Sequence, residues 1–472
     1  MSRLVVVSNR VSLPAPDGAA TGGLAVGIQA ALEDNGGLWF GWSGETCDSE
    51  PGPAKVETHG NTKYATIELN KSEYELYYNG FANRSLWPVF HYLLAYYAYD
   101  RAAYEAYWRV NSVFVRKLLP LLEPDDIIWV HDYHLIPLVN GLREAGITNP
   151  IGFFLHVPFP DFDMLRVLPP HRSLLRAMGE YDVVGFHTER DRRNFVGGLT
   201  QATVGGEWID DYRIRLDDHV CRTDVYPIGI EVDTIKALAQ KATEEHQVQQ
   251  LVYSLVGREL IIGVDRLDYS KGLEGRFGAY ERLLEKYPSN RKAVTYMQIA
   301  PPTRTGVRDY DEIRLDLERA SGHINGRFAT PDWVPLRYLN TGIKRELLMG
   351  VFRAAHVGLV TPVRDGMNLV AKEYVASQDP DDPGMLVLSR LAGAATELRE
   401  AILVNPYDID DVADGIEQAL SMSLQERRHR HQAMMETLER NDITTWRSRF
   451  VNDLQAAGLK TDDSARSSDN AA

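Results

Sequence analysis

The stretch from Val357 to Val375 constrains the fold more than any other part of the sequence. Val357–Pro362 has the apolar pattern of a buried strand that ends at a proline, and apolar residues recur at helical spacing over Leu369–Val375. The loop between them holds an aspartate, a glycine and an asparagine. Backbone N–H groups and the positive end of a helix dipole meet at such a loop, so it suits an anion such as a diphosphate. An ordinary strand-to-helix turn that binds nothing fits the same spacing.

Short strand-like runs alternate with helical patterns along the whole chain. In the first half these runs are Leu4–Val7, Leu38–Trp42, Tyr64–Leu69, Asp126–Val130, Gly152–Leu155, Val183–Phe186 and Asp224–Ile228. In the second half they are Leu260–Val264, Val294–Ile299, Arg337–Leu339, Met385–Ser389 and Ala401–Val404. Buried runs that alternate with helices indicate parallel sheets and an α/β fold. The polar helical segment Asp233–Gln250 separates the two series and predicts a domain boundary after residue 232.

Charge and apolar patterning argue against several classes of protein. Lys and Arg total 51 against 66 Asp and Glu, a formal net charge of −15. This disfavours a general nucleic-acid or membrane-surface role but leaves room for a local basic pocket. No window is apolar for long enough to span a membrane, and Met1–Asn9 is typical of a first strand, not of a signal peptide. Cys47 and Cys221 form no metal-binding pattern, and we expect a reducing compartment, the cytoplasm.

Two features of the first series suit a ligand but also have plainer explanations. Gly22 and Gly23 precede a helical pattern at Leu24–Leu32, and they could let a loop close on a ligand or simply form a flexible turn. Their spacing is not the dinucleotide-binding fingerprint. The dense aromatic run from Tyr77 to Tyr99 is typical of a core. Hydrogen-bonding side chains interleaved with aromatic rings are also how proteins hold sugars.

Histidines and aspartates follow the ends of two predicted strands. His131 and His134 follow one strand, and His156 follows the next. Because open α/β sheets bind ligands at the carboxyl ends of their strands, we favour hydrogen bonds to substrate over metal binding. A histidine bonded to backbone is the alternative. Asp161–Asp163 and Asp408–Asp410 match the Asp-x-Asp pattern of metal-dependent sugar transferases, but we expect both in solvated turns.

Two cations follow the first strand of the second series. Arg266 and Lys271 lie five residues apart on the loop after Leu260–Val264, an arrangement that suits a diphosphate. A surface salt-bridge cluster with Asp265 and Asp268 is the alternative.

The C-terminal region combines an apolar helix face with a polar end. Ile443, Trp446, Phe450 and Leu454 fall on one face at helical spacing. So large an apolar stripe must dock on something, and the first domain is the expected target. Residues 459–472 are polar and are expected to be a disordered tail.

Several long motifs resemble one family, in the same order along the chain. They are Leu4–Arg10, Gly22–Leu24, Trp39–Trp42, His131–His134, Arg266–Gly272 and Arg364–Glu373. The match runs from Met1 to about Leu454 and leaves out only the tail and the segments Asp48–Asn61 and Gly198–Arg222. On these motifs the chain resembles the trehalose-phosphate synthase family of retaining GT-B glycosyltransferases.

The resemblance implies an α/β fold of the GT-B type, with two Rossmann-like β/α/β domains and an interdomain cleft. The expected parts are an acceptor-binding domain at 1–232, a nucleotide-sugar-binding domain at 233–440, a helix at 441–458 that returns to the first domain, and the tail at 459–472. It also implies a homo-oligomer, with a tetramer suspected, and no nucleic-acid or membrane partner.

The implied reaction moves glucose from UDP-glucose to glucose 6-phosphate with retention and gives α,α-trehalose 6-phosphate and UDP. This reaction belongs to trehalose biosynthesis, which protects cells against osmotic and other stress. The resemblance implies no cofactor and no metal. Because no carboxylate stands out as a covalent nucleophile, we expect a front-face route in which the acceptor hydroxyl attacks from the side that UDP leaves.

The resemblance carries donor-binding roles over to this chain residue by residue. Arg266 and Lys271 would bind the diphosphate, Asp365 would face the glucose, and Glu373 would accept from the ribose hydroxyls. The full donor set is Gly22, Gly23, Arg266, Lys271, Ile343, Asp365, Asn368, Leu369, Val370, Ala371, Lys372 and Glu373. Family members carry an aromatic residue beside the uracil where this chain has Ile343. A contact through the backbone there would change little, whereas a contact through the ring would put the preference for uridine in doubt.

The acceptor roles come from the same source. Arg10, Tyr78 and Arg304 would hold the phosphate of glucose 6-phosphate. Trp87 would pack on the acceptor sugar and Asp132 would orient it. The residues expected to act in catalysis are Asp132, His156, Arg266, Lys271 and Asp365, with His156 bonded to the donor sugar.

Three other functions are compatible with parts of the sequence. A related glucosyltransferase could use another phosphorylated acceptor, such as glycerol 3-phosphate, or another nucleotide-glucose donor. An NAD(P)-dependent oxidoreductase could share the Rossmann-like domains, but the dinucleotide fingerprint is absent from the sequence. A non-catalytic sugar-phosphate sensor would be expected to lack the diphosphate cations, whereas Arg266 and Lys271 are both present.

Overall fold

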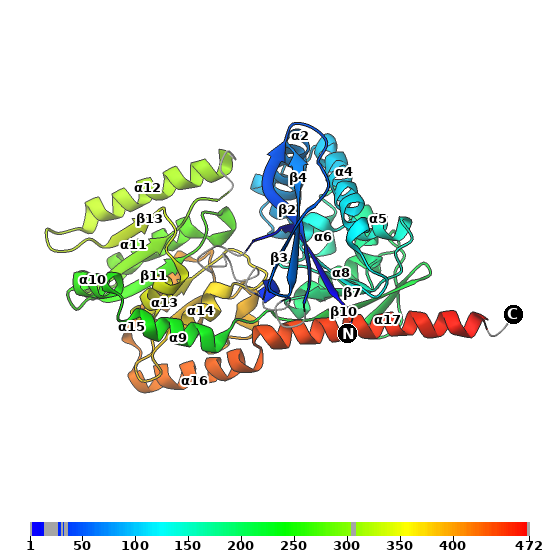
Figure 1. Cartoon of the computed structure of the whole chain (residues 1–472). Helices are drawn as coiled ribbons and strands as arrows, with labels where there is room; N and C mark the ends of the chain where they lie inside the picture. Colours follow the sequence, from blue (N-terminus) through cyan, green and yellow to red (C-terminus); the bar gives the residue numbers. More distant parts are fainter. Residues whose placement is uncertain (1, 14–26, 30–31, 33–35, 304–307, 470–472) are drawn as a thin grey trace. The chain divides into compact units, whose positions relative to one another are not determined.

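The computed structural model describes residues 2–13, 27–29, 32, 36–303 and 308–469, and the chain divides into two compact units (Figure 1). Unit 1 comprises Met1–Ile228 with Ile443–Ala472, and unit 2 comprises Gly229–Asp442. The chain therefore changes unit after residues 228 and 442, where the sequence placed boundaries after 232 and 440. The expected site residues Gly22, Gly23 and Arg304, and most of the expected helix at 24–32, lie outside the described residues.

Unit 1 is built on a ten-stranded sheet in the order β3-β4-β2-β1-β5-β6-β7-β10-β9-β8. Its strands are β1 (Leu4–Arg10), β2 (Gly37–Cys47), β3 (Lys55–His59), β4 (Thr62–Asn70), β5 (Ile127–His131), β6 (Ile151–Phe154), β7 (Val183–Phe186), β8 (Glu207–Trp208), β9 (Arg213–Leu216) and β10 (His219–Val225). Neighbours from β4 to β10 pair in parallel, and antiparallel strands extend both edges. Strands β5, β6 and β7 are buried along their whole length, as their continuous apolar runs predict.

The helical elements of unit 1 connect and cover these strands. They are α2 (Lys71–Tyr74), the π-helical η1 (Glu75–Leu86), α3 (Trp87–Phe90), η2 (Leu94–Tyr96), α4 (Arg101–Leu118), η3 (Leu119–Leu121), η4 (Tyr133–Leu135), α5 (Leu138–Glu144), α6 (Phe162–Leu165), α7 (His171–Gly179), α8 (Glu189–Leu199) and α17 (Ile443–Asp469). The longest before α17 is α4, which begins where the Asp100 carboxylate accepts the Ala102 N–H at 2.8 Å.

Unit 2 is built on a six-stranded parallel sheet in the order β13-β12-β11-β14-β15-β16. Its strands are β11 (Glu259–Val264), β12 (Val294–Ile299), β13 (Leu336–Leu339), β14 (Val357–Val360), β15 (Met385–Ser389) and β16 (Ile402–Val404). Its helical elements are α9 (Val232–Ala242), α10 (His246–Leu255), η5 (Tyr269–Lys271), α11 (Leu273–Lys286), η6 (Pro288–Asn290), α12 (Arg308–Phe328), α13 (Arg345–Arg353), α14 (Leu369–Ser377), η7 (Gly393–Thr396), α15 (Ile409–Ser421) and α16 (Leu424–Arg440).

Both sheets share the strand order of a Rossmann fold. In unit 2 the central strand β11 has β12 and β13 on one side and β14, β15 and β16 on the other. In unit 1 the central strand β1 has β2 and β4 on one side and β5, β6 and β7 on the other. Loops after the two central strands diverge in such sheets, and ligands bind in the crevice between them. Each unit therefore has its own switch point, at β1/β5 in unit 1 and at β11/β14 in unit 2.

The C-terminal helix α17, red in Figure 1, packs on the sheet of unit 1 through its predicted apolar stripe. The rings of Trp446 and Phe450 lie 4.9 and 4.8 Å from that of Trp129 on β5. On the next strand, a Cβ at Gly152 would lie 2.8 Å from the Phe450 ring, so glycine makes room for the helix there. The segment after residue 442 thus belongs to the core of the first unit.

The structure differs from the expected secondary structure at three places. The helix α17 runs to Asp469, whereas residues 459–472 were expected to be a disordered tail. A docked helix extends by one hydrogen bond per residue once its first turns have formed, so a polar segment can continue it. The strand expected at Asp224–Ile228 instead ends at Val225, and the helix expected at Asp233–Gln250 is two helices, α9 and α10.

The segments outside the family resemblance supply edge strands. The first of them, Asp48–Asn61, contains β3, and the second, Gly198–Arg222, contains β8 and β9. These antiparallel additions cover the parallel core at both edges. Among the residues that the structure describes, none of the helices combines the length and apolar character that crossing a membrane requires.

Candidate active site

The switch point of unit 1 brings together residues expected to bind the acceptor. Arg10 ends β1 and Asp132 directly follows β5. The Arg10 guanidinium lies 5.8 Å from the centre of the Trp42 ring, and the Tyr78 ring lies 6.3 Å from the same ring. Arg10 and Tyr78 therefore share a neighbour on β2, and one phosphate group could accept hydrogen bonds from both.

A column of stacked rings holds Tyr78. Its ring lies 5.2 Å from Tyr74 at 13° on one side and 5.5 Å from His134 at 10° on the other. Tyr74 and Tyr78 lie four residues apart, across the α2–η1 junction. The sequence left His134 as a substrate ligand or a backbone-bonded histidine, but its ring is a stacking partner of Tyr78. The phenol is thereby fixed in orientation before any ligand arrives.

Trp87 is more buried than its expected role requires. Only 5% of its surface is exposed, and its ring lies 4.1 Å from His91 and 5.7 Å from Tyr133. Tyr133 follows Asp132, so the structure does bring Trp87 to the switch point. Only a small part of this ring is therefore accessible to a sugar.

Asp132 occupies a strained backbone conformation at the end of β5. Its φ of 75° and ψ of 164° are rare for any residue except glycine, and such strain collects at functional sites. Its N–H donates to the Phe154 carbonyl at 2.8 Å, which extends the pairing of β5 with β6. Its Oδ1 accepts the backbone N–H of His156 at 3.2 Å. The strained Asp132 thus fixes the backbone of His156, which lies just after β6 and is expected to bond the donor sugar.

Two neutral histidines meet beside this aspartate. Nδ1 of His131 lies 3.0 Å from Nε2 of His156, within hydrogen-bond distance. Burial, together with neighbouring His156, holds the pKa of His131 well below its usual value. Burial, together with neighbouring His187, does the same for the pKa of His156. Both imidazoles are therefore neutral near pH 7, and this part of the site offers hydrogen bonds without charge.

The switch point of unit 2 is organised by an ion pair. Lys271 lies in η5 after β11, and Asp365 lies in the loop after β14. The Lys271 ammonium is 2.5 Å from Oδ2 of Asp365, and the Asn368 amide donates to the same oxygen at 3.1 Å. The sequence assigned the two charged residues separate roles, whereas the structure joins them. A diphosphate would therefore have to share or replace Asp365 as the partner of Lys271.

Arg266 is exposed and has no hydrogen bond or ion pair with another described residue. The alternative of a salt-bridge cluster with Asp265 and Asp268 is wrong. Asp265 instead pairs with Arg276 at 2.8 Å, and Asp268 accepts the Ser270 N–H at 2.9 Å to cap η5. The Arg266 guanidinium is therefore available for a ligand.

Arg276 is a supporting residue that the sequence analysis missed. Its side chain is fully buried and donates to Gln298 at 3.0 Å and to Thr361 at 3.1 Å, as well as to the Lys271 carbonyl at 3.2 Å. It thereby ties the Lys271 loop to β12 and to the end of β14. An arginine on the same helical face as Leu273 and Phe277 was the available signal, since a cation is rarely buried unless it is paired.

The loop after β14 ends in a capped helix start. Asn368 has a left-handed backbone with φ of 85°, and its side-chain oxygen accepts the Ala371 N–H at 3.1 Å to cap α14. Leu369 and Val370 follow in the half-buried first turn. A helix of this kind leaves N–H groups of its first turn free of intrahelical partners, so this end of α14 suits the expected diphosphate cradle.

The last two expected donor residues have partners within unit 2. The Lys372 ammonium is buried 2.6 Å from Glu397, and burial lowers its pKa although Glu397 opposes the shift. Its side chain is therefore structural, and only its backbone can serve a ligand. Glu373 lies 3.3 Å from Arg345, and burial raises its pKa against the opposing effect of that cation. The half-buried Ile343 lies two residues before Arg345, just ahead of α13.

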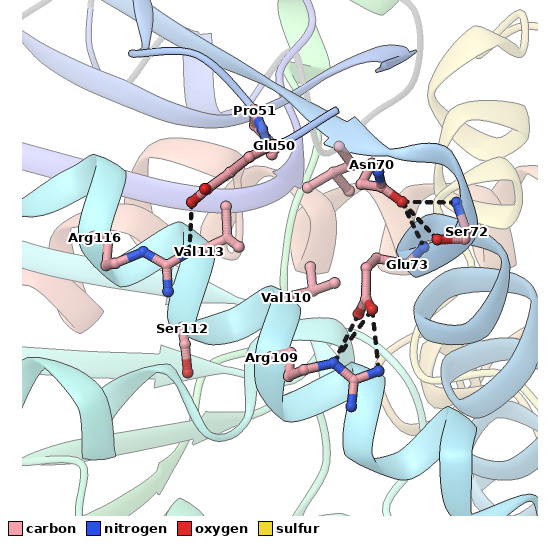
Figure 2. Close-up of a pocket in the computed structure, with 11 residues that line it drawn as sticks. Glu50, Pro51, Asn70, Ser72, Glu73, Arg109, Val110, Ser112, Val113 and Arg116 are labelled. Atoms are coloured by element: carbon pink, nitrogen blue, oxygen red, sulfur yellow. Dashed lines mark hydrogen bonds and ion pairs between the residues drawn. The ribbon is translucent and has the colours of Figure 1, made fainter. Parts of the chain in front are cut away.

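A pocket elsewhere in unit 1 contains none of the expected site residues. It encloses about 620 Å³ and is lined by Glu50, Pro51, Leu69, Asn70, Ser72, Glu73, Arg109, Val110, Ser112, Val113 and Arg116 (Figure 2). Arg109 pairs with Glu73 at 3.1 Å and Arg116 with Glu50 at 3.5 Å, so each cation facing this pocket already has a carboxylate partner. The candidate active site therefore lies at the switch points and not here.

The Asp-x-Asp strings serve as helix caps. Asp161 accepts the Met164 N–H at 2.9 Å at the start of α6, and Asp408 accepts the Asp411 N–H at 3.1 Å at the start of α15. The expectation of plain solvated turns is thus corrected, because each first aspartate begins a helix.

Comparisons with known proteins agree with this arrangement. The glycosyltransferase family 20 profile matches residues 9–456. A trehalose-6-phosphate synthase from Klebsiella pneumoniae is 51% identical over 464 residues, covering 98% of this chain and 97% of that protein. Relatives therefore match nearly the whole chain, including both switch points.

Two solved structures are similar over both units. The UDP-forming α,α-trehalose-phosphate synthase from Burkholderia xenovorans, in complex with glucose-6-phosphate, has a TM-score of 0.93 at 50% identity and covers 96% of this chain and 100% of its own. An E. coli protein bound with UDP-2-fluoro glucose has a TM-score of 0.91 at 49% identity and covers 96% and 99%. The predicted GT-B fold of two parallel-sheet α/β domains is thus confirmed, and the chain belongs to glycosyltransferase family 20.

Proposed function

We propose that this protein transfers glucose from UDP-glucose to glucose 6-phosphate with retention and releases α,α-trehalose 6-phosphate and UDP. The observation that carries the proposal is the unit 2 switch point, where Lys271, the exposed Arg266 and the start of α14 lie on the two central loops. Relatives of about 50% identity that bind glucose-6-phosphate or UDP-2-fluoro glucose support it.

On the donor side, the cations act on charge that develops during the reaction. UDP gains negative charge as its bond to glucose breaks, and Arg266 and Lys271 stabilise that charge. Asp365 binds hydroxyls of the donor glucose when a phosphate takes its place beside Lys271. Glu373 accepts hydrogen bonds from the ribose, and Gly22 and Gly23 complete the donor site.

On the acceptor side, Arg10, Tyr78 and Arg304 bind the phosphate of glucose 6-phosphate. Asp132 orients the acceptor sugar, and Trp87 packs on it. The stacked, fixed phenol of Tyr78 favours a site formed in advance.

The chemical step follows a front-face route. The bond between C1 of glucose and the β-phosphate oxygen breaks as the acceptor oxygen bonds to C1 on the same face. The acceptor hydroxyl proton passes to the departing phosphate oxygen, so no protein carboxylate forms a bond to the sugar. Mass spectrometry of the enzyme quenched during turnover tests this route, because a glucosyl ester on any Asp or Glu would refute it.

The reaction needs no metal or other cofactor. Arg266 and Lys271 supply the positive charge that a divalent ion provides in many sugar transferases. The first aspartate of each Asp-x-Asp string already caps a helix, which supports the proposal. Full activity after dialysis against EDTA is the expected result, and restoration of lost activity by Mg²⁺ or Mn²⁺ would contradict it.

The protein works in the cytoplasm and forms a homotetramer. Its role is trehalose synthesis during stress. Cys47 and Cys221 are both unpaired, which supports a reducing compartment. Light scattering after size exclusion tests the oligomeric state, since the chain mass is 53.2 kDa. A single species of monomer mass would contradict the tetramer.

One assay matrix tests the function as a whole. UDP-, ADP- and GDP-glucose are each combined with glucose 6-phosphate, glycerol 3-phosphate and fructose 6-phosphate, and the products are identified. We expect turnover chiefly with UDP-glucose and glucose 6-phosphate. The comparison of UDP-, ADP- and GDP-glucose is the most informative part, because the aliphatic Ile343 cannot supply an aromatic face to a uracil.

A further inference from the structure

His131 contacts an expected catalytic residue but has no role in the reaction described above. It ends β5, has no exposed surface, and is enclosed by the rings of Trp129, Phe154 and Trp446. Its Nδ1 lies 3.0 Å from Nε2 of His156. A hydrogen bond in such apolar surroundings is stronger than one in water. This contact can therefore decide which ring nitrogen of His156 carries the proton.

The proton in this contact has two possible positions, because each neutral imidazole carries one N–H. In the first, Nδ1–H of His131 donates to Nε2 of His156, and the His156 proton is on Nδ1. In the second, Nε2–H of His156 donates to His131, whose own proton is then on Nε2. The two arrangements leave different groups without a partner.

The surroundings of His131 favour the first arrangement. Its Nε2 is buried and has no hydrogen-bond partner within the part of the chain that the structure describes. The second arrangement would leave an N–H donor buried there without an acceptor, whereas the first leaves only a lone pair. Orphaned buried N–H groups are the rarer of the two in proteins.

We propose that His131 is a positioning residue that holds His156 as the Nδ1–H tautomer, with that N–H directed to an oxygen of the donor sugar. The neighbouring Asp132 accepts the backbone N–H of His156 at 3.2 Å, so two consecutive residues fix both the backbone and the ring of His156. The Nδ1 of His156 has no hydrogen bond with another described residue. The sugar as target rests on the proposed function, whereas the tautomer does not.

Nitrogen NMR of the full-length protein labelled with ¹⁵N-histidine tests the tautomer directly. Protonated and bare ring nitrogens of a neutral imidazole have well-separated shifts, and the signals that disappear in His156→Gln identify His156. We expect Nδ1 to be protonated in the wild type and in His131→Asn, whose amide N–H can take the place of Nδ1–H. A His156 protonated on Nε2 in the wild type would overturn the proposal without any variant of His131.

Kinetics of the same variants test what the tautomer does. His131→Leu should lower kcat about tenfold through loss of one buried hydrogen bond, with the KM for glucose 6-phosphate changed less than about twofold. His131→Asn should restore most of kcat. His171→Leu is the matched control, since it removes an imidazole bonded to the Leu168 carbonyl at 2.8 Å elsewhere in unit 1, and its kcat should not change.

The outcomes separate the two proposals. An unchanged His156 tautomer in His131→Leu, or equal kcat in His131→Leu and the wild type, would overturn the positioning role. A wild-type protein that turns over no sugar-nucleotide pair would overturn the proposed function and leave the tautomer measurement standing.

Discussion

The two switch points share one strand order but hold their side chains by opposite means. In unit 1, His156 is held by a hydrogen bond between its neutral ring and that of His131, and by one from its backbone N–H to Asp132. Tyr78 is held in a column of stacked rings. In unit 2, Lys271 is paired with Asp365, above the buried pair of Asp265 and Arg276. At the carboxyl edge of the unit 1 sheet, packing holds these side chains in place. At the carboxyl edge of the unit 2 sheet, charge holds them.

The difference matches what each edge is proposed to bind. A sugar offers hydroxyls and small apolar faces, which fixed rings and neutral imidazoles can recognise without changing charge. A nucleoside diphosphate gains charge as it leaves, and only fixed cations respond to that change. Mutations should therefore affect the two edges differently, and four predictions test this, from the largest expected effect to the smallest.

Removing the buried cation of unit 2 should have the largest effect on stability. Arg276→Met leaves Asp265 without its partner at a buried site, so unit 2 should lose about 3–5 kcal/mol of unfolding free energy. Hydrogen exchange of the β11 and β14 amides measures this loss. Arg282→Met is the control on the same helix, since its pair with Asp410 is exposed and its loss should lower the unfolding free energy far less. Equal losses in the two variants would show that charge does not organise this edge.

Removing the diphosphate cations should affect turnover more than acceptor binding. Arg266→Ala and Lys271→Ala should each raise the barrier by about 2–4 kcal/mol, measured as kcat, with the KM for glucose 6-phosphate changed little. Lys286→Ala is the control, because that exposed lysine of unit 2 pairs only with surface carboxylates. Unchanged kcat in both test variants would contradict the proposal that Arg266 and Lys271 bind the donor diphosphate.

Replacing the strained aspartate should separate strain from function in unit 1. Asp132→Gly relieves a left-handed conformation worth about 1–3 kcal/mol but removes the carboxylate that holds the His156 N–H. We expect stability equal to or above that of the wild type, with kcat lowered about tenfold. Asp217→Gly is the control, since Asp217 has φ of 53° in the exposed turn before β10, and kcat should be unchanged. A full loss of folding in Asp132→Gly would contradict this.

The neutral histidines should make the stability of unit 1 depend on pH. Because their pKa values are lowered, His131 and His156 stay neutral in the folded protein while the unfolded chain binds protons below about pH 6.5. Stability is therefore full well above pH 6.5 and falls as the pH drops through that value, by about 1.4 kcal/mol for each histidine between pH 7.5 and 5.5. Hydrogen exchange of the β5 and β6 amides measures this, and the double variant His131→Asn, His156→Gln should show a smaller loss. An equal loss in that variant would assign the pH dependence to other groups.

Local pattern was enough to predict the fully buried strands of both sheets. Apolar runs such as Val183–Phe186, Val294–Ile299 and Met385–Ser389 match strands with the same ends in the structure, because a strand buried on both faces must be apolar throughout. The edge strand β3 could not be predicted in this way, since all five of its residues are exposed. The π-helix η1 was recognised in the sequence only as an aromatic run. The apolar spacing used to recognise an α-helix differs from the spacing in a π-helix.

The site was predicted as a set of residues but not as a set of contacts. Sequence position places Arg266, Lys271 and Asp365 after strands of one sheet, and parallel strands bring their ends to one edge. It could not show that Lys271 pairs with Asp365, since the two lie 94 positions apart. Arg276 was missed for the same reason, because its partners come from separate strands and loops of the folded sheet.

By itself, the sequence determined the two β/α series, the ends of their strands and the residues at those ends. These are local properties, set by the alternation of apolar runs and turns. The tertiary structure alone decided which strand ends become neighbours, and so which charges pair and which rings stack. That choice left His131 and His156 of unit 1 neutral and Arg276 of unit 2 charged, because burial beside a second histidine disfavours protonation, whereas the carboxylate of Asp265 keeps the buried guanidinium charged.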